Sequence, residues 1–234
     1  MAEIVSKNKF KIVVFISMLT ILLIISFTVQ LAADGPELVY RIPVTGNIDN
    51  GLFRFVERGV AAAEGDGADL IVFEIDTYGG YVDPAIKIRD LILSTELPTV
   101  TFVSGRAWSA GALIALAGEE LFMVPGSSMG AAETRPDDEK YISALRKEFK
   151  ATAETRGKNS ELAVAMVDAD LEIEGMIVSG KLLTLTAREA VDNNMADDMV
   201  AAIPTLFEKL EGQPGQIVEI DMTLAEKAAR YINT

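Results

Sequence analysis

Short apolar runs alternate with amphipathic stretches along most of the chain. The runs Leu70–Ile75, Thr99–Val103 and Leu121–Val124 are bounded by turn residues, as is typical of buried parallel strands. Between them, apolar positions at helical spacing predict a helix over Pro84–Ser94, and small residues predict a close-packed helix over Ser109–Ala117. This alternation of strand and helix with short connections predicts an α/β fold, a parallel sheet flanked by helices.

Further elements are predicted on both sides of this segment. They are a strand Glu37–Ile42, a helix through Phe53 and Ala63 that Gly65-Asp66-Gly67 ends, a long charged helix Asp137–Gly157, a shorter helix from Ser160 to about Val167, a helical segment in Thr184–Asn193 with a Thr186/Glu189 capping box, a strand Gln216–Ile220 and a terminal helix with Leu224, Ala228 and Tyr231 on one face. We find no internal repeat, and one domain accounts for the pattern.

The first 33 residues differ from the rest. Lys7, Lys9 and Lys11 precede an uncharged, strongly apolar stretch, Ile12–Ala33. As a helix this stretch would be about 33 Å long, enough for the hydrocarbon layer of about 30 Å. It predicts a membrane anchor, or alternatively a cleaved signal peptide, over residues 1–33 and an exported domain over 34–234. The basic flank places that domain on the extracytoplasmic side of the membrane.

Composition narrows the chemistry. The chain has 234 residues, of which 50% are apolar, and it contains no histidine and no cysteine. A Ser-His-Asp triad, a Cys-His dyad, a histidine-ligated zinc site, disulfides and iron–sulfur clusters are therefore excluded. A net charge of −14 argues against nucleic acid as a partner, because phosphate binding needs a basic surface.

Two short motifs could carry nucleophilic catalysis. Gly79-Gly80 closely follows a predicted strand, and backbone amides exposed by glycines there could form an oxyanion hole, although taken alone a plain strand-to-helix turn is the favoured explanation of the pair. Ser109 lies among small residues at a predicted helix start, where a serine is most often only an N-cap. As a nucleophile it would benefit from the helix dipole and the neighbouring amides.

Without histidine, the remaining common base for such a serine is a lysine. Its pKa, ordinarily about 10.4, would have to fall to about 7–8 through burial. At about 100° per residue, Lys150 lies about 100° from the apolar stripe of the charged helix, Lys147 about 160° and Lys140 nearly opposite. Lys150 is the one most easily placed beside the core, whereas for any single lysine a solvated charge is the simpler explanation.

In this order the motifs resemble the ClpP-class membrane serine proteases of the NfeD type, within the ClpP/crotonase and signal-peptide-peptidase-A superfamily. The resemblance covers nearly the whole exported domain. It rests on Asp76-Thr77-Tyr78-Gly79-Gly80, Arg106-Ala107-Trp108-Ser109-Ala110-Gly111-Ala112, Val124–Ala131, Ala153–Asn159 and Leu183–Ala190.

The resemblance implies a ClpP/crotonase-like spiral of β-β-α units and a Ser-Lys dyad protease without a cofactor or metal. Ser109 matches the nucleophile and Lys150 the base, with Lys140 as a fallback. The amides of Gly80 and Ala110 match the oxyanion donors. The implied substrate-binding residues are Gly79, Tyr81, Ser128 and Met129.

The resemblance also implies partners and leaves alternatives open. It points to a homo-oligomer that cleaves apolar segments of stomatin- or flotillin-like membrane proteins. The family usually has proline where Tyr78 stands, and its longer members continue into further membrane spans. A catalytically silent scaffold that binds a stomatin-like protein is one alternative. A crotonase-type acyl-CoA enzyme is another, which export away from cytoplasmic CoA disfavours.

Overall fold

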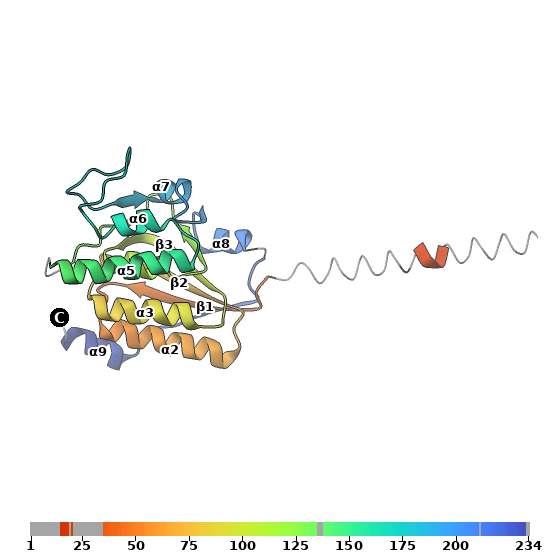
Figure 1. Ribbon diagram of the computed structural model, residues 1–234. Helices are drawn as coiled ribbons and strands as arrows, with labels where there is room; N and C mark the ends of the chain where they lie inside the picture. Colours follow the sequence, from red (N-terminus) through yellow and green to blue (C-terminus); the bar gives the residue numbers. More distant parts are fainter. Residues whose placement is uncertain (1–14, 19, 21–34, 135–137, 211, 233–234) are drawn as a thin grey trace, which may run out of the picture.

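The computed structural model describes residues 15–18, 20, 35–134, 138–210 and 212–232 (Figure 1). Residues 15–18 and 20 are helical, and the remainder of the predicted anchor or signal segment lies outside the described residues. No helix among the described residues is long and apolar enough to cross a membrane.

The strands form one eight-stranded sheet. In chain order they are β1 (Leu38–Thr45), β2 (Leu70–Thr77), β3 (Thr99–Trp108), β4 (Glu120–Met123), β5 (Ser128–Gly130), β6 (Thr184–Thr186), β7 (Asp198–Met199) and β8 (Gln216–Glu219). The main order is β6-β5-β3-β2-β1-β8, while β4 pairs with β3 and β7. Every pairing is parallel except that of β5 with β6, so the predicted parallel sheet is confirmed.

Most helices lie on one side of this sheet. They are α2 (Asn50–Asp66), α3 (Val82–Ser94), α4 (Ala110–Ala115), α5 (Glu139–Thr155), α6 (Ser160–Ala165), α7 (Ala187–Asp192), α8 (Ile203–Lys209) and α9 (Leu224–Ile232). Figure 1 shows α9, α2, α3 and α5 side by side across the front of the sheet. The Gly65-Asp66-Gly67 breaker acts as predicted, because Gly67 ends α2 in a left-handed conformation with φ 68°.

Side chains at alternate positions of the strands pack into two apolar clusters, one on each face of the sheet. On the helix side, Ile42, Phe73 and Val103 pack with α2 to α7 in the large core. On the opposite side, Val72 and Phe102 pack with Phe207 of α8 in a smaller cluster. Strands buried on both faces read as continuous apolar runs, which is the pattern that the sequence displays.

One predicted strand end needs correction, and the terminal helix makes its contacts in an unexpected way. Strand β3 continues to Trp108, five residues beyond the predicted end at Val103, with a register shift against β2. Of the three residues expected on one face of the terminal helix, Leu224 is 85% exposed and Ala228 is exposed too, while the side chain of Tyr231 lies outside the described residues. Helix α9 instead contacts α2 through Glu226 and Arg230, whose charged groups find ionic partners there.

Candidate active site

Ser109 stands where β3 turns abruptly into α4. Its backbone has φ 53° and ψ −126°, a positive-φ conformation outside the left-handed helical region that is rare for a non-glycine residue. Its amide donates to the Gly130 carbonyl over 2.7 Å, and its side chain makes no capping hydrogen bond to α4. The simple N-cap explanation of this serine therefore fails.

The glycine pair lies directly against this serine. A methyl group added at Gly79, where φ is +107°, would come 2.7 Å from Ser109 Cβ and 3.2 Å from its Oγ. Within the described part of the chain, nothing accepts a hydrogen bond from the amide of Gly80. The amide of Ala110 belongs to the first turn of α4, where amides have no partner within the helix. The structure thus brings Ser109 together with Gly79 and the neighbouring Gly80.

Gly80 is in turn fixed by the loop after β1. Ile48 donates its amide to Gly79 O over 3.0 Å and accepts from the Tyr81 amide over 2.8 Å, forming a parallel bridge with Gly80. An added methyl at Gly80 would overlap the backbone of Ile48. Both glycines are required by close backbone approach, which is more than a plain turn demands.

The predicted substrate-binding residues have different surroundings. Tyr81 is 58% exposed at the N-cap of α3 and is accessible to a bound chain. Ser128 is partly buried and its hydroxyl accepts a hydrogen bond from Trp108 Nε1 over 2.8 Å. Met129 is fully buried in the core, so its side chain presents no accessible surface.

Next to Ser109 lies an aromatic cluster that the sequence did not predict. Tyr78 and Trp108 meet edge to face, with ring centroids 5.4 Å apart. The Arg106 guanidinium lies 5.1 Å from the Tyr78 centroid and 5.6 Å from that of Trp108. Tyr78 thus has two partners at the position where the related family usually has proline. The unusual tyrosine at position 78 was the one sequence signal for this cluster. Its partners Arg106 and Trp108 could not be inferred from it, because they lie on the neighbouring strand β3.

Lys150 lies on α5 and faces outward. Its side chain is 46% exposed, and its Nζ is 3.7 Å from Glu154 Oε1. It borders an open hollow of about 210 Å³ that is also lined by Ser160, Glu161, Val164 and Leu171. Among the described residues, no hydrogen bond joins Lys150 to the Ser109 hydroxyl, and the amine of Lys150 is paired with Glu154 instead. Lys140, the fallback, is exposed near the Tyr141 ring.

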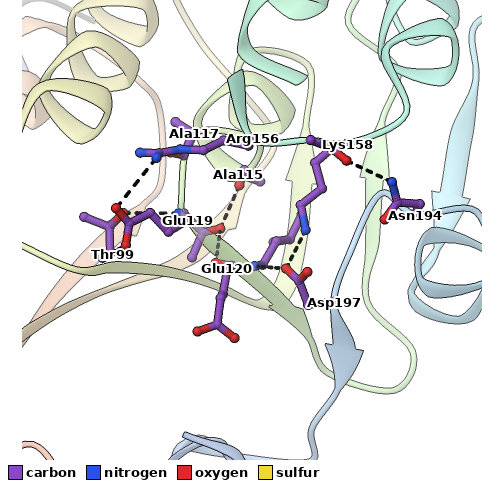
Figure 2. A network of polar contacts seen from close by, with 12 residues as sticks. Thr99, Ala115, Ala117, Glu119, Glu120, Arg156, Lys158, Asn194 and Asp197 are labelled. Carbon is purple, nitrogen blue, oxygen red and sulfur yellow. Dashed lines mark hydrogen bonds and ion pairs between the residues drawn. The ribbon is translucent and has the colours of Figure 1, made fainter. Parts of the chain in front are cut away.

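The turn after α5 ties this helix to the end of α4, as Figure 2 shows. Arg156 Nε donates to the Ala117 carbonyl over 2.7 Å. The Lys158 side chain is 4% exposed and its Nζ lies 2.5 Å from Asp197 Oδ2, which also accepts from the Leu121 amide. Burial, together with the charge of Asp197, raises the pKa of nearby Glu120. This network sets the position of the helix that carries Lys150 relative to the helix that Ser109 begins.

No group of three or more acidic side chains suited to a metal ion occurs among the described residues.

Comparison with known proteins supports the resemblance. The family described as "NfeD1b, N-terminal domain" matches residues 38–220. The membrane protein NfeD1b of Bacillus subtilis is 35% identical over 92% of this chain, and the membrane-bound protease PH1510 of Pyrococcus horikoshii is 27% identical over 84%. The alignments cover 51% and 46% of those two proteins, so the chain spans about half the length of the curated relatives it matches.

Solved structures agree on the fold. A membrane-bound stomatin-specific protease, 1510-N, in a lysine-to-alanine variant with a substrate peptide, superposes with a TM-score of 0.68 at 23% identity, covering 86% of this chain and 98% of that one. ClpP1 from Listeria monocytogenes superposes with a TM-score of 0.58 at 21% identity, covering 71% and 94%. The ClpP-like fold expected from the sequence is confirmed.

Proposed function

The chain belongs to the NfeD1b N-terminal domain family, and on that premise we propose that it is a serine endopeptidase in which Ser109 is the nucleophile and Lys150 the general base. The conformation of Ser109 carries the proposal. A strained backbone, a hydroxyl that caps nothing and a neighbouring glycine whose lack of a side chain leaves room for that serine serve no evident packing purpose. Strain of this kind is concentrated at functional sites.

The reaction would be acyl transfer. The neutral amine of Lys150 takes the proton of the Ser109 hydroxyl while Oγ bonds to the peptide carbonyl carbon. The amides of Gly80 and Ala110 stabilise the resulting oxyanion. The lysine ammonium then protonates the leaving amine as the C–N bond breaks. Water, deprotonated by the same amine, hydrolyses the acyl ester and releases Ser109.

The choice of Lys150 over Lys140 rests on spacing in a relative. The solved 1510-N structures include one variant with a serine replaced by alanine and one with a lysine replaced. Those two positions are as far apart in that sequence as Ser109 and Lys150 are in this one. For the amine to reach Ser109 it must leave Glu154, and an exposed ion pair of that kind is worth only about 0–1 kcal/mol.

We propose a peptide substrate bound in extended form past Gly79 and the exposed Tyr81. PH1510 is named a membrane-bound protease, and the 1510-N structures are described as specific for a stomatin homologue. By analogy, the substrate class here would be apolar segments of stomatin- or flotillin-like proteins. The predicted membrane location, the extracytoplasmic side and the homo-oligomer are part of the same proposal.

The proposal is tested with a fluorogenic peptide of apolar sequence. Wild-type protein should cleave it, and Ser109→Ala should reduce the rate by at least about 10³-fold, as expected for loss of a nucleophile. Ser94→Ala, at the far end of α3, is the matched control and should retain the wild-type rate. Equal rates for wild type and Ser109→Ala would reject the proposal.

The exposed position of Lys150 favours one alternative, a scaffold without catalysis. In that case the wild type would cleave nothing, while binding to a stomatin-like protein would be the same with Ser109→Ala. Cleavage that depends on Ser109 would exclude the scaffold. Nothing in the described residues favours the acyl-CoA enzyme.

A further inference from the structure

Arg230, on the last helix of the domain, reaches the loop that follows β1. Its Nε lies 3.1 Å from Asp49 Oδ2, and its Nη2 donates to the Asn47 carbonyl over 2.6 Å and to the Thr45 carbonyl over 3.3 Å. Asp49 is 4% exposed and also caps α2 by accepting from the Leu52 amide over 2.8 Å. A buried carboxylate of this kind requires a cationic partner, which Arg230 provides.

The loop leaves room for this side chain through two glycines. A methyl group added at Gly51 would come 2.6 Å from Arg230 Cγ. At Gly46, where φ is +72°, it would come 3.2 Å from Nη2. The absence of side chains at Gly46 and Gly51 therefore lets the arginine lie close against this loop.

The same loop supports the Gly79-Gly80 turn. Thr77 is 1% exposed; its hydroxyl donates to the Gly46 carbonyl over 2.6 Å and accepts from the Gly79 amide over 2.9 Å. Ile48 forms the bridge to Gly80 described above, one residue from the carbonyl of Asn47. The guanidinium of Arg230 and the turn at Gly79 thus bond to adjacent residues of one short loop, Arg230 to the carbonyls of Thr45 and Asn47 and the turn to Gly46 and Ile48.

We propose that Arg230 is a positioning residue for the oxyanion turn. By holding the carbonyls of Thr45 and Asn47 and neutralising Asp49, it fixes the loop on which Gly80 is seated. It touches neither the substrate nor the reacting atoms. The inference rests on the proposed function, because it assigns Gly80 the role of oxyanion donor.

A matched control is available on the same helix pair. Arg58 of α2 binds Glu226 of α9 through Nε and Nη2, each at 2.9 Å, and donates to the Asp221 carbonyl at 2.9 Å. It docks α9 on α2 but makes no contact with residues 45–49 among its described bonds. Arg58→Ala therefore weakens the docking of α9 without removing the support of the turn.

The first measurement is kinetic, with the fluorogenic apolar peptide. Arg230→Ala should lower kcat by about 10- to 100-fold, somewhat less than the loss of one oxyanion donor, and leave KM within about twofold of wild type. Arg230→Lys, which keeps the charge, should recover part of kcat, while Arg58→Ala should retain the wild-type kcat. Equal losses in Arg230→Ala and Arg58→Ala would overturn the proposal, because undocking of α9 would then explain both.

The second measurement does not depend on activity. Hydrogen exchange at the amides of Ile48 and Tyr81 reports the bridge to the glycine turn directly. Arg230→Ala should accelerate exchange at both amides by about tenfold or more, and Arg58→Ala should not. Unchanged exchange in Arg230→Ala overturns the positioning role, whereas an inactive wild type with accelerated exchange in the variant leaves that support intact and rejects only the proposed function.

Discussion

The turns around Ser109 and the helix that carries Lys150 are held in different ways. Ser109 is fixed by its own strained backbone, by contact with Gly79 and by a hydrogen bond to Gly130. Lys150 is half exposed and has one ion pair, at 3.7 Å, with a neighbour on its own helix. Under the proposed function, the turn that holds Ser109 is already formed, whereas the amine of Lys150 has to move toward it. Catalytic hydrogen bonds commonly tighten only in the complex with substrate.

The largest effect is expected from removing the amine of Lys150. Lys150→Met should lower kcat by about 10³-fold, within the range for loss of a general base. Lys147→Met, at another exposed position of α5, should retain the wild-type rate. Because Lys150 makes little buried contact, both variants should melt within about 1–2 °C of wild type, corresponding to changes below about 0.5 kcal/mol. Full activity in Lys150→Met would show that another group takes the proton.

The close fit between Gly79 and Ser109 is tested by Gly79→Ala. The new methyl would press on Ser109 Cβ and on the Trp108 carbonyl, and its backbone would be held at φ +107°. We expect a loss of about 1–3 kcal/mol in unfolding free energy and at least a 100-fold loss of peptide cleavage. Gly65→Ala is the control, because a methyl there meets nothing within 4 Å, and it should be neutral or stabilising by up to about 1 kcal/mol. Wild-type cleavage by Gly79→Ala would contradict the close fit at the serine.

The network that holds the end of α5 is tested at Lys158, which is buried, unlike Lys150. Lys158→Met leaves Asp197 without its ion-pair partner and should lower the unfolding free energy by about 1–3 kcal/mol. This is less than for a fully buried pair, because Asp197 is 37% exposed. The double variant with Asp197→Asn should recover part of that loss. Denaturant unfolding measures both, and a Lys158→Met protein as stable as wild type would show that the network does not hold the helix.

The smallest expected effect concerns the docking of α9. The Arg58 guanidinium, through its hydrogen bonds, lowers the pKa of Glu226 from 4.5 to about 2. A carboxyl with a lowered pKa stabilises the fold above its unfolded pKa and loses that contribution as the pH falls. The stability difference between wild type and Glu226→Gln should therefore be constant above about pH 5. It should shrink as the pH falls through 4.5 toward 2, and a difference independent of pH would contradict the pairing.

Much of the fold could be predicted from the sequence, because β2, α3, β3 and β4 each carry a pattern long enough to identify them. The two- and three-residue strands β5, β6 and β7 could not, since so few residues show no periodicity. The contact of α9 could not be predicted either, because it depends on ionic partners of Glu226 and Arg230 at Arg58 of α2 and at Asp49, the N-cap of α2.

In the candidate site, the closeness of Ser109 to the glycine pair could be predicted from the sequence, whereas the position of Lys150 and the aromatic cluster could not. Ser109, Gly79 and Gly80 are adjacent to strand ends, and parallel strands bring such ends together at one edge of the sheet. The position of Lys150 depends on the rotation of a surface helix and on a flexible side chain, neither of which spacing determines. The cluster of Tyr78, Arg106 and Trp108 depends on register between β2 and β3, which includes a shift that no local pattern reveals.

The central claim, that Ser109 is a nucleophile activated by Lys150, is tested most directly by covalent labelling. Wild-type protein would be treated with a fluorophosphonate, digested, and its adduct located by mass spectrometry. The account predicts a single adduct on Ser109, absent in Ser109→Ala and formed about 10²-fold or more slowly in Lys150→Met. An unlabelled Ser109 in wild-type protein, or labelling at the wild-type rate in Lys150→Met, would contradict it.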